Sequence, residues 1–282
     1  MITFKREIPK TIFFIHFDSG KDLSLITYLA IKSAIEANQD CEVILYTDNK
    51  SLPGDWGRAI TKIHNLKVMD IPSFDKIRNV EYAKLSFAHK ADILRLQILY
   101  ATGGIYLDTD VISNRPFFGL IDDLLGSQAS SIMNSTVILG KEEVYGKFVG
   151  YANAVMIASA ESTFLNRWLD GFDKDKSLWK GLRSEGYDKF YTELSVKYSK
   201  FLGFLYPEEI IEVSRGYFYY PNYTPEELNH FFLEDYDGSF DRCYAFHLWG
   251  NASSYDYLKD LTKESIKSSN SNFASIVKRY LD

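Results

Sequence analysis

The sequence predicts an α/β fold, with a mixed sheet flanked by helices and followed by a helical and irregular C-terminal part. The first indication is the continuous apolar run of residues 11–17, which is typical of a parallel strand buried on both faces. Residues 24–38 then repeat apolar side chains at helical spacing, and residues 41–47 form a second apolar run. A strand, a helix and a strand in this order indicate a β-α-β unit.

The rest of the chain continues this alternation. We expect helices over residues 81–102 and 163–172, strands over 66–71, 105–112, 151–159, 209–213 and 243–248, short elements at 121–125 and 132–139, and a short strand at 200–206. The aromatic run of residues 216–221 is expected to be a packed edge strand rather than a platform for a sugar. Apolar spacing over residues 258–282 predicts a closing helix or two. We therefore expect one domain over residues 1–255, with residues 256–282 as a helical tail packed on it.

Length and composition limit the classes of function. The 282 residues can bury a sizeable core, and 46% apolar and 25% charged residues are ordinary for a globular protein. A net charge of −6 argues against a general nucleic-acid binder. Cys41 and Cys243 are too few for a disulfide framework. No N-terminal segment has signal-peptide length, and none reaches the roughly 18 apolar residues of a membrane span. We expect a cytoplasmic protein, either free or at the inner face of the membrane.

Residues 91–112 carry the pattern on which the functional prediction depends. Asp92 and Arg95 lie about one turn apart on the predicted helix, so their side chains share one face. Gly103 and Gly104 follow, and glycine is the usual way to leave a helix because the left-handed turn costs it nothing.

The strand predicted directly after these glycines carries paired carboxylates. Its pleat puts Asp108 and Asp110 on one face, where like charges repel. A divalent cation is the simplest compensation, because Mg²⁺ and Mn²⁺ are commonly held by one or two carboxylates plus a substrate's phosphates. A bare Asp-x-Asp is more often a strand that ends in a solvated acidic turn. The preceding helix with Asp92 and Arg95, and its Gly-Gly end, favour the functional interpretation.

Two histidines extend the predicted site. His16 lies near the C-terminal end of the first strand, where open α/β sheets place their ligands, and a ligand contact and a structural role are equally supported. Residues 18–20 lack the glycine pattern of dinucleotide-binding proteins, so phosphates must be held another way, which again favours a metal. His247 ends the strand of residues 243–248, and the turn that follows is rich in glycine and serine. Such a strand and turn can bring an imidazole and hydroxyls to a site.

Four blocks of the sequence resemble the glycosyltransferases of family 32, which carry a sugar-binding region with a D-x-D motif, and more remotely the large glucosylating toxins. These blocks are residues 8–12, 91–110, 153–159 and 247–249, and the second is the specific one. The resemblance implies the GT-A fold, a Rossmann-like α/β domain that binds a nucleotide sugar and a divalent metal, Mn²⁺ or Mg²⁺.

The resemblance also implies roles for the matching residues. Asp92 and Arg95 would hydrogen-bond the hydroxyls of the donor sugar. Asp108 would contact the ribose and the metal, and Asp110 would bind the metal directly. His247 would be a further metal ligand. Asp108, Asp110 and Arg95 are therefore the predicted catalytic residues.

Further residues are expected to bind the nucleotide. Ile15 and His16 stand at the end of the first strand, where the family usually has a tryptophan that faces the uracil. Imidazole stacks more weakly than indole, so the identity of the base stays open. In the terminal turn, Ser253 would contact the nucleotide's diphosphate or the metal, together with Asn251 and Ser254.

The predicted activity is metal-dependent transfer of a hexose from a nucleotide sugar, which we expect to be a UDP-hexose, to a hydroxyl of a glycan or other acceptor, with retention of configuration. A growing surface polysaccharide is one such acceptor. If the outcome were inversion, Glu193 or Asp188 would be the candidate base. Two alternatives stay open, a haloacid-dehalogenase-like phosphohydrolase and a non-catalytic sugar-binding protein. The phosphohydrolase fold requires threonine at the position of Ile112. The presence of all the candidate site residues disfavours a non-catalytic protein.

Overall fold

A computed structural model of the chain describes residues 7–72, 78, 80, 82, 85–127, 137–172 and 195–281. The strands are β1 (Thr11–His16), β2 (Glu42–Thr47), β3 (Leu66–Asp70), β4 (Gly104–Leu107), β5 (Val111–Ser113), β6 (Val137–Val144), β7 (Lys147–Ala158), β8 (Ile210–Val213) and β9 (Ala245–His247). Seven of them form one sheet in the order β3-β2-β1-β4-β7-β6-β8. The first four of these are parallel, whereas β7 is antiparallel to both β4 and β6. The predicted mixed sheet is confirmed.

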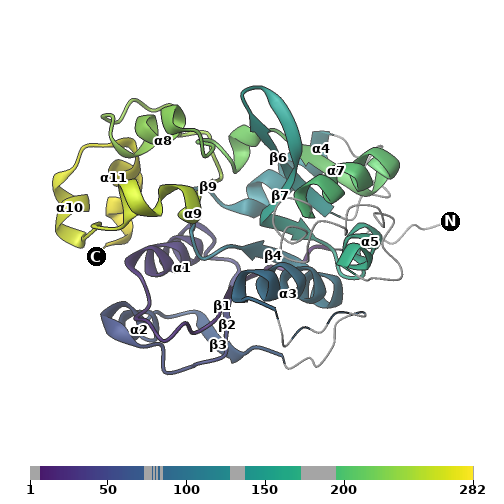
Figure 1. Cartoon of the computed structure of the whole chain (residues 1–282), viewed down its shortest axis with the longest axis horizontal. Helices are drawn as coiled ribbons and strands as arrows, with labels where there is room; N and C mark the ends of the chain where they lie inside the picture. The colour runs from purple at the N-terminus through teal and green to yellow at the C-terminus, as the bar shows by residue number, and fades with distance from the viewer. Residues whose placement is uncertain are drawn as a thin grey trace.

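Helices flank this sheet and form the C-terminal part (Figure 1). The α-helices are α1 (Leu25–Ala37), α2 (Gly54–Ile60), α3 (Phe87–Thr102), α4 (Phe117–Ser127), α5 (Thr163–Phe172), α7 (Ser195–Leu205), α8 (Pro225–Phe232), α9 (Gly250–Ser253), α10 (Lys263–Ser268) and α11 (Asn272–Val277). Shorter turns of helix are η4 (Pro207–Glu209), η5 (Arg215–Tyr217), η6 (Ser254–Leu258) and η7 (Lys278–Tyr280). In Figure 1, α8, α10 and α11 lie together on the left with the C-terminus, on the side away from α5 and α7.

The side chains of β1 alternate between two hydrophobic layers. Ile12 and Phe14 belong to the layer that contains the apolar face of α1. Phe13 and Ile15 belong to the layer that contains α3 and α5. β1 also pairs in parallel with β2 on one side and β4 on the other. The prediction of a parallel strand buried on both faces is therefore confirmed, and its carboxyl end is fixed in the middle of the sheet.

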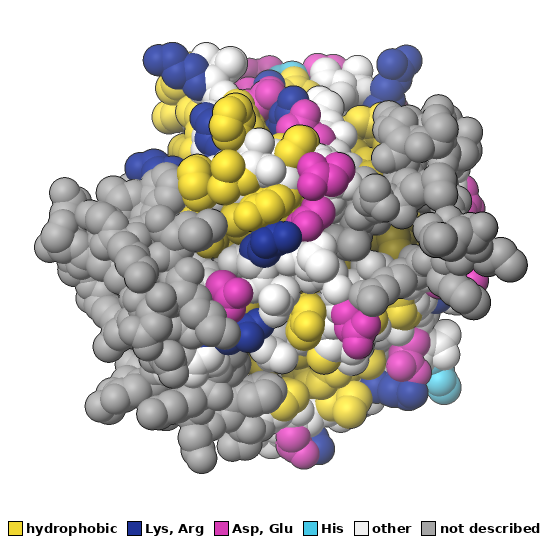
Figure 2. Space-filling model, turned by 90° about the vertical axis from the view of Figure 1, so that its right-hand side faces the viewer, with side chains coloured by type: hydrophobic (Ala, Val, Ile, Leu, Met, Phe, Trp, Pro, Cys, Tyr) yellow, Lys and Arg dark blue, Asp and Glu magenta, His cyan; other side chains and the backbone are white. Residues whose placement is uncertain are grey.

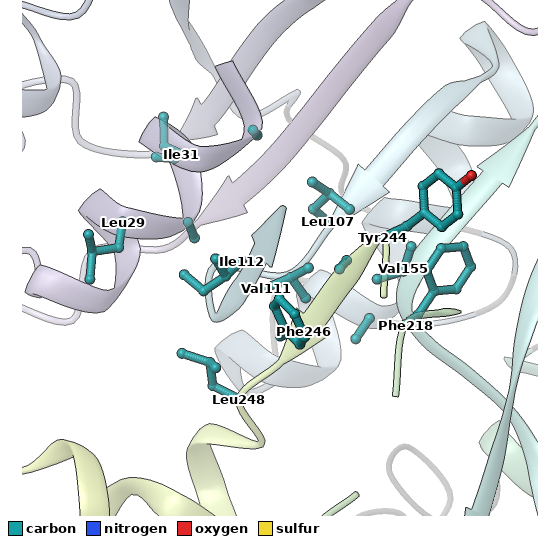
Figure 3. Packing of buried hydrophobic residues seen from close by; sticks show 14 of the residues in the cluster. Leu29, Ile31, Leu107, Val111, Ile112, Val155, Phe218, Tyr244, Phe246 and Leu248 are labelled. Atoms are coloured by element: carbon teal, nitrogen blue, oxygen red, sulfur yellow. The ribbon is translucent and has the colours of Figure 1, made fainter. Parts of the chain in front are cut away.

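A second, two-stranded sheet joins β5 to β9. The pairing is antiparallel and sets Val111 opposite His247. Figure 3 shows Ile112 and Phe246 side by side in this small sheet, with Leu29 of α1 close by, and all three belong to one hydrophobic layer. Packing of this layer thus brings a distant part of the chain next to the segment that carries the paired aspartates.

The prediction of one continuous strand over residues 105–112 is wrong. β4 ends at Leu107, and the backbone N–H of Val111 donates to the carbonyl of Asp108 at 3.0 Å, which closes a turn. The reason is the pairing of β5 with β9, which draws the chain away from the main sheet. Asp108 and Asp110 therefore lie in a turn between two strands and do not share the pleat of one strand.

Other boundaries also differ from the predictions. α3 begins at Phe87 and not near residue 81, because the side chain of Ser86 caps its first turn by accepting from the backbone N–H of His89. Residues 200–206 belong mainly to α7 and the aromatic run of residues 216–221 is not a strand, because both bury side chains against the sheet instead of extending it. The predicted helix of residues 163–172 and strand of residues 209–213 are confirmed, the latter as β8.

The C-terminal residues pack on the rest of the chain. Phe273, Val277 and Tyr280 belong to the same hydrophobic layer as α1 and β1. The predicted closing helices are confirmed as α10 and α11, whereas the division at residue 255 stays a prediction. No helix within the described ranges is long and apolar enough to cross a membrane. On the face shown in Figure 2, the visible basic and acidic side chains are interspersed.

Candidate active site

A pocket of about 970 Å³ opens at the carboxyl ends of β1 and β4. Ile15 and His16 reach it from β1, Tyr106 from β4, and Asp108 from the turn that follows. Open α/β sheets place ligands at this edge, because the side chains that follow several parallel strands converge there. Of the predicted site residues whose side chains the structure describes, the pocket contains all except Ser253.

Asp92 and Arg95 face the pocket from α3, as their spacing predicts. The guanidinium NH2 lies 3.0 Å from Asp92 Oδ1, and both side chains are buried. The side-chain amide of Asn153 on β7 donates to the same carboxylate oxygen at 2.8 Å. Burial raises the pKa of Asp92 to about 6, against the opposing charge of Arg95. Because burial makes this carboxylate costly to ionise, a further hydrogen-bond donor such as a sugar hydroxyl would stabilise its ionised form.

Arg95 links α3 to the turn after β4. Its NH1 lies 3.1 Å from Asp108 Oδ1 and donates to the carbonyl of Asn153 at 2.9 Å. Its Nε donates to the carbonyl of Ala91 at 3.1 Å, and the guanidinium lies 4.6 Å from the centre of the Tyr106 ring. Because a buried arginine stays charged, this group fixes the position of Asp108 electrostatically.

Asp108, Asp110 and His247 form a cluster that can hold a metal ion. One possible ligand atom from each lies within 4.8 Å of the other two. The pairing of Val111 with His247 and the donation from Leu248 N to the carbonyl of Asp110 at 2.9 Å place the imidazole beside the aspartates. The predicted proximity of the three side chains thus comes from strand pairing across a long stretch of chain.

Asp110 is held from two directions. Its Oδ1 lies 3.4 Å from His247 Nε2, and its Oδ2 accepts a hydrogen bond from the backbone N–H of Gly250 at 2.8 Å. Burial alone would raise the pKa of Asp110, but the charge of His247 and these hydrogen bonds lower it below its ordinary value. Burial likewise acts to lower the pKa of His247, but the charge of Asp110 raises it overall. Each of the two groups thus favours the charged form of the other.

The donor set fits a hard or borderline divalent cation. Two carboxylates and an imidazole are ligands that Mn²⁺ accepts readily and Mg²⁺ accepts in part. Among the described residues, nothing hydrogen-bonds Nδ1 of His247, although this atom is buried. The nitrogen that faces the aspartates is Nε2, so the preference between ions rests on the imidazole itself, which is a better ligand for Mn²⁺ than for Mg²⁺. Mn²⁺ therefore suits this cluster somewhat better than Mg²⁺.

The end of the pocket where a nucleotide is predicted to bind lies between β1, α1 and α3. His16 and Phe17 line it beside Ser24 and Thr27, and Phe17 stacks on Phe87 at 5.3 Å between ring centres. Burial lowers the pKa of His16, so its imidazole is neutral near neutral pH. Ile15 and His16 are placed as predicted, and their contact with a base stays a prediction.

Ser253 lies outside the pocket lining and is fully buried. Its hydroxyl donates to the backbone carbonyls of Leu248 and Trp249, so it closes the first turn of α9. This placement indicates a structural role, and we do not include Ser253 in the proposed site. The side chains of Asn251 and Ser254 lie outside the described part of the chain. The candidate bases Glu193 and Asp188 lie outside the described residues.

Sequence reasoning missed several residues of the pocket. Glu142 of β6 lines it, because β6 continues beyond the predicted end at residue 139. Tyr223 lines it from a loop that carries no motif, and Gly250 does so through its backbone. Trp249 lies in the block of residues 247–249 but was given no role, and Gly250 had a signal as a glycine just after the strand that carries His247. Asn153 lines the pocket as well, and its side-chain amide donates to Asp92.

Fold and site together give a pocket at the carboxyl ends of parallel strands, beside a cluster that could hold a divalent metal. Comparisons with known proteins identify the class. Residues 27–132 match the family described as the glycosyltransferase sugar-binding region containing the DXD motif. This region includes Asp108 and Asp110. The chain therefore carries this sugar-binding region on a fold that it shares with GT-A glycosyltransferases. This match favours a glycosyltransferase over the phosphohydrolase alternative, whereas the non-catalytic alternative is left to the activity test.

Similarity to single proteins extends beyond the region that matches the family. "Glucan organizing enzyme 1" of Cryptococcus neoformans var. grubii is 27% identical over 272 residues, which are 93% of this chain and 66% of that protein. The glycosyltransferase GlyE of Streptococcus pneumoniae has a similar structure, with a TM-score of 0.53, 14% identity, and coverage of 97% of this chain and 60% of that one. The galactosyltransferase LgtC, solved with donor and acceptor sugar analogues, has a TM-score of 0.52 at 12% identity, with coverage of 96% and 95%. The chain thus spans about two thirds of the length of the fungal relative.

Proposed function

We propose that this glycosyltransferase is metal-dependent and moves a hexose from a UDP-hexose to a hydroxyl of a glycan, with retention of configuration. The observation that carries the proposal is the cluster of Asp108, Asp110 and His247 inside the pocket. A diphosphate leaving group needs its charge neutralised, and this donor set suits the ion that does so. The name of the fungal relative, which refers to glucan, supports a glycan acceptor. Retention rests on the resemblance to family 32.

Different residues of the pocket would bind the metal, the donor sugar and the base. Asp108, Asp110 and His247 would hold Mn²⁺ or Mg²⁺, which when bound supplies a Lewis acid for the leaving diphosphate. Asp92 would accept hydrogen bonds from donor hydroxyls, and Arg95 would orient both Asp92 and Asp108. The walls from β1 and α3 would enclose the base and keep water from the sugar. Catalysis then depends on charges that are in place before the donor binds.

A donor screen tests this proposal. Release of the free nucleotide would be measured with UDP-glucose, UDP-galactose, UDP-GlcNAc and GDP-mannose, each with Mn²⁺, with Mg²⁺ and with excess chelator. We expect metal-dependent turnover of one UDP-hexose, and a proton NMR spectrum of the glycoside product in which the anomeric configuration of the donor is kept. Turnover that persists in chelator would contradict the metal role, and an inverted product would contradict retention alone.

The variant Asp110→Asn removes one charge from the cluster. We expect turnover to fall more than about 100-fold, because loss of outer-shell partners of a metal already costs up to that factor. The matched control is Asp55→Asn, which changes an exposed carboxylate on α2 that pairs with Arg58 far from the pocket. Equal activity of the two variants would refute the assignment of Asp110.

A further inference from the structure

Glu142 is a buried carboxylate that the donor site does not use. It lies on β6 with 8% of its surface exposed, and it lines the pocket. Within the described ranges it forms no ion pair with a lysine or arginine, and the side chain of Tyr223 hydrogen-bonds it. An ionised carboxylate offers about four acceptor positions, so one tyrosine leaves most of them unfilled. A buried acceptor with free capacity that faces a pocket is suited to bind a hydroxyl donor.

Aromatic rings stand beside this carboxylate. Tyr223 and Trp249 both line the pocket, and their rings meet edge to face at 5.0 Å between centres. Trp249 is fixed, because its Nε1 donates to the carbonyl of Pro221 at 2.9 Å and its ring lies 4.2 Å from that of His247. Tyr223 is 37% exposed, so part of its ring is available to a ligand. An aromatic face next to a hydrogen-bond acceptor is the combination that fits a sugar ring.

This group reaches the metal cluster from other elements than the predicted donor residues. Glu142 lies near enough to His247 for its charge to act on the imidazole, and the ring of Trp249 lies against the same imidazole. The residues predicted for the donor sugar and the base come from β1 and α3, whereas Glu142 and Tyr223 come from β6 and the loop before α8. The metal cluster therefore borders both sets of residues, and the sugar would pass from donor to acceptor beside it.

We propose that Glu142, Tyr223 and Trp249 form the subsite for the acceptor, and that the acceptor is a saccharide. Glu142 accepts hydrogen bonds from hydroxyls of the acceptor sugar, and the aromatic rings pack against its C–H face. A serine or threonine side chain offers a single hydroxyl and no ring face, so it would make few contacts with these three residues. This inference rests on the proposed function.

The test separates transfer from donor hydrolysis. Wild-type protein and Glu142→Gln would be supplied with the UDP-hexose that the donor screen selects, with and without acceptor probes. The probes are the p-nitrophenyl glycosides of glucose, galactose and mannose, and a peptide that contains serine and threonine. Hydrolysis without acceptor reports the donor site, and formation of the disaccharide product reports the acceptor site.

We expect Glu142→Gln to raise the acceptor KM about tenfold or more, because hydrogen bonds to charged groups are the stronger ones, while hydrolysis of the donor stays within about twofold. The control Glu143→Gln changes the next carboxylate on β6, which is not part of the pocket lining, and should leave both rates unchanged. Thermal unfolding of both variants shows whether the fold is retained.

The ring of Tyr223 is tested separately. Tyr223→Ala should raise the acceptor KM for the glycosides, whereas Tyr223→Phe keeps the ring and should change it less. An equal loss of hydrolysis and transfer in Glu142→Gln would assign Glu142 to the donor or to folding and overturn the subsite. Transfer to the peptide but to no glycoside would overturn the saccharide acceptor. If wild-type protein releases no nucleotide from any donor, the proposed function itself fails, and the subsite fails with it.

Discussion

Single residues of this site are positioned by contacts within the chain. Arg95 shows this most clearly, because its guanidinium already binds Asp92, Asp108 and two backbone carbonyls. Its first role is therefore to orient two carboxylates, and any contact with the donor sugar adds to that role. Leaving two buried carboxylates without this cation would be costly, so substitution of Arg95 would disturb the geometry of the whole cluster.

Gly250 is predicted to be required for the position of Asp110. A Cβ at residue 250 would lie 2.9 Å from Asp110 Oδ2, so the carboxylate would have to move and lose its bond to the backbone N–H. We expect Gly250→Ala to fold normally and to bind Mn²⁺ about tenfold more weakly, as for other losses of outer-shell partners. Isothermal titration with Mn²⁺ measures this. Gly119→Ala, where the nearest atom is 3.9 Å away, is the control, and an equal affinity in both variants would contradict the prediction.

Metal affinity is predicted to rise with pH. In the metal-free chain, burial acts to lower the pKa of His247, but the nearby carboxylates raise it above 6.5 overall. Below that pKa, a metal must displace a proton from the imidazole, so affinity should rise about tenfold per pH unit and level off above it. Asp110 contributes no slope there, because its pKa is lowered. Mn²⁺ titrations between about pH 6 and pH 8 test this, and His247→Gln should remove the slope.

At the scale of elements, the junction of α3 and β4 sets the position of the aspartates. Gly103 and Gly104 both have positive φ, 69° and 107°, and the chain reverses direction between the helix and the sheet. A Cβ at Gly104 would lie 2.7 Å from the carbonyl oxygen of Thr11 on β1. The glycine pair thus does more than end a helix, since it also allows β4 to approach β1 closely.

Gly104→Ala is predicted to be strongly destabilising. We expect the free energy of unfolding to fall by about 2–4 kcal/mol, because both the positive φ and the contact with backbone atoms are unfavourable. Gly20→Ala is the matched control, with φ of 73° and no atom within 4 Å of the added Cβ, and should cost about 1 kcal/mol. Urea unfolding measures the free energy of unfolding of both variants. The difference between their losses gives the effect of the contact with Thr11, because both variants share the strain of a positive φ. Similar losses in the two would show that close approach to β1 is unimportant.

At the scale of the whole molecule, the C-terminal helices share the core of the sheet domain. Phe273, Val277 and Tyr280 are buried in the layer that also contains α1, and the hydroxyl of Tyr280 donates to the carbonyl of Ser113 at 2.9 Å. This bond reaches β5, one residue beyond Ile112, and so supports the strand that pairs with β9. The tail is thereby connected to the position of His247.

Deletion of residues 259–282 is predicted to abolish cooperative folding. Removal of one buried phenylalanine side chain lowers the free energy of unfolding by roughly 3–5 kcal/mol. Removal of several such side chains lowers it by several times that amount, which is more than the usual stability of a domain. Circular dichroism during thermal unfolding measures this. Phe273→Ala should retain a cooperative but lower transition, whereas an exposed change such as Lys267→Ala should leave it unchanged. A stable truncated chain would instead support an independent domain over residues 1–255.

The local parts of the fold and site followed from sequence patterns. Helical spacing placed Asp92 and Arg95 on one face, and the apolar run of residues 11–17 gave the buried strand that ends at His16. The pattern failed where pairing with a distant segment decided the outcome. Residues 105–112 were apolar enough for one strand, but β9 competes for their second half. Residues 200–206 were too short for periodicity to separate strand from helix.

The sequence by itself indicated the class of this protein, because the residues predicted to hold a nucleotide sugar lie close together in the chain and their spacing is readable. Asp92 to Asp110 is one such stretch. Only the tertiary structure decided which groups complete the site. Gly250 meets Asp110, and Glu142 comes near His247, through contacts between segments far apart in sequence. Such contacts depend on how the sheets and layers pack, and no local pattern in this chain encodes that packing.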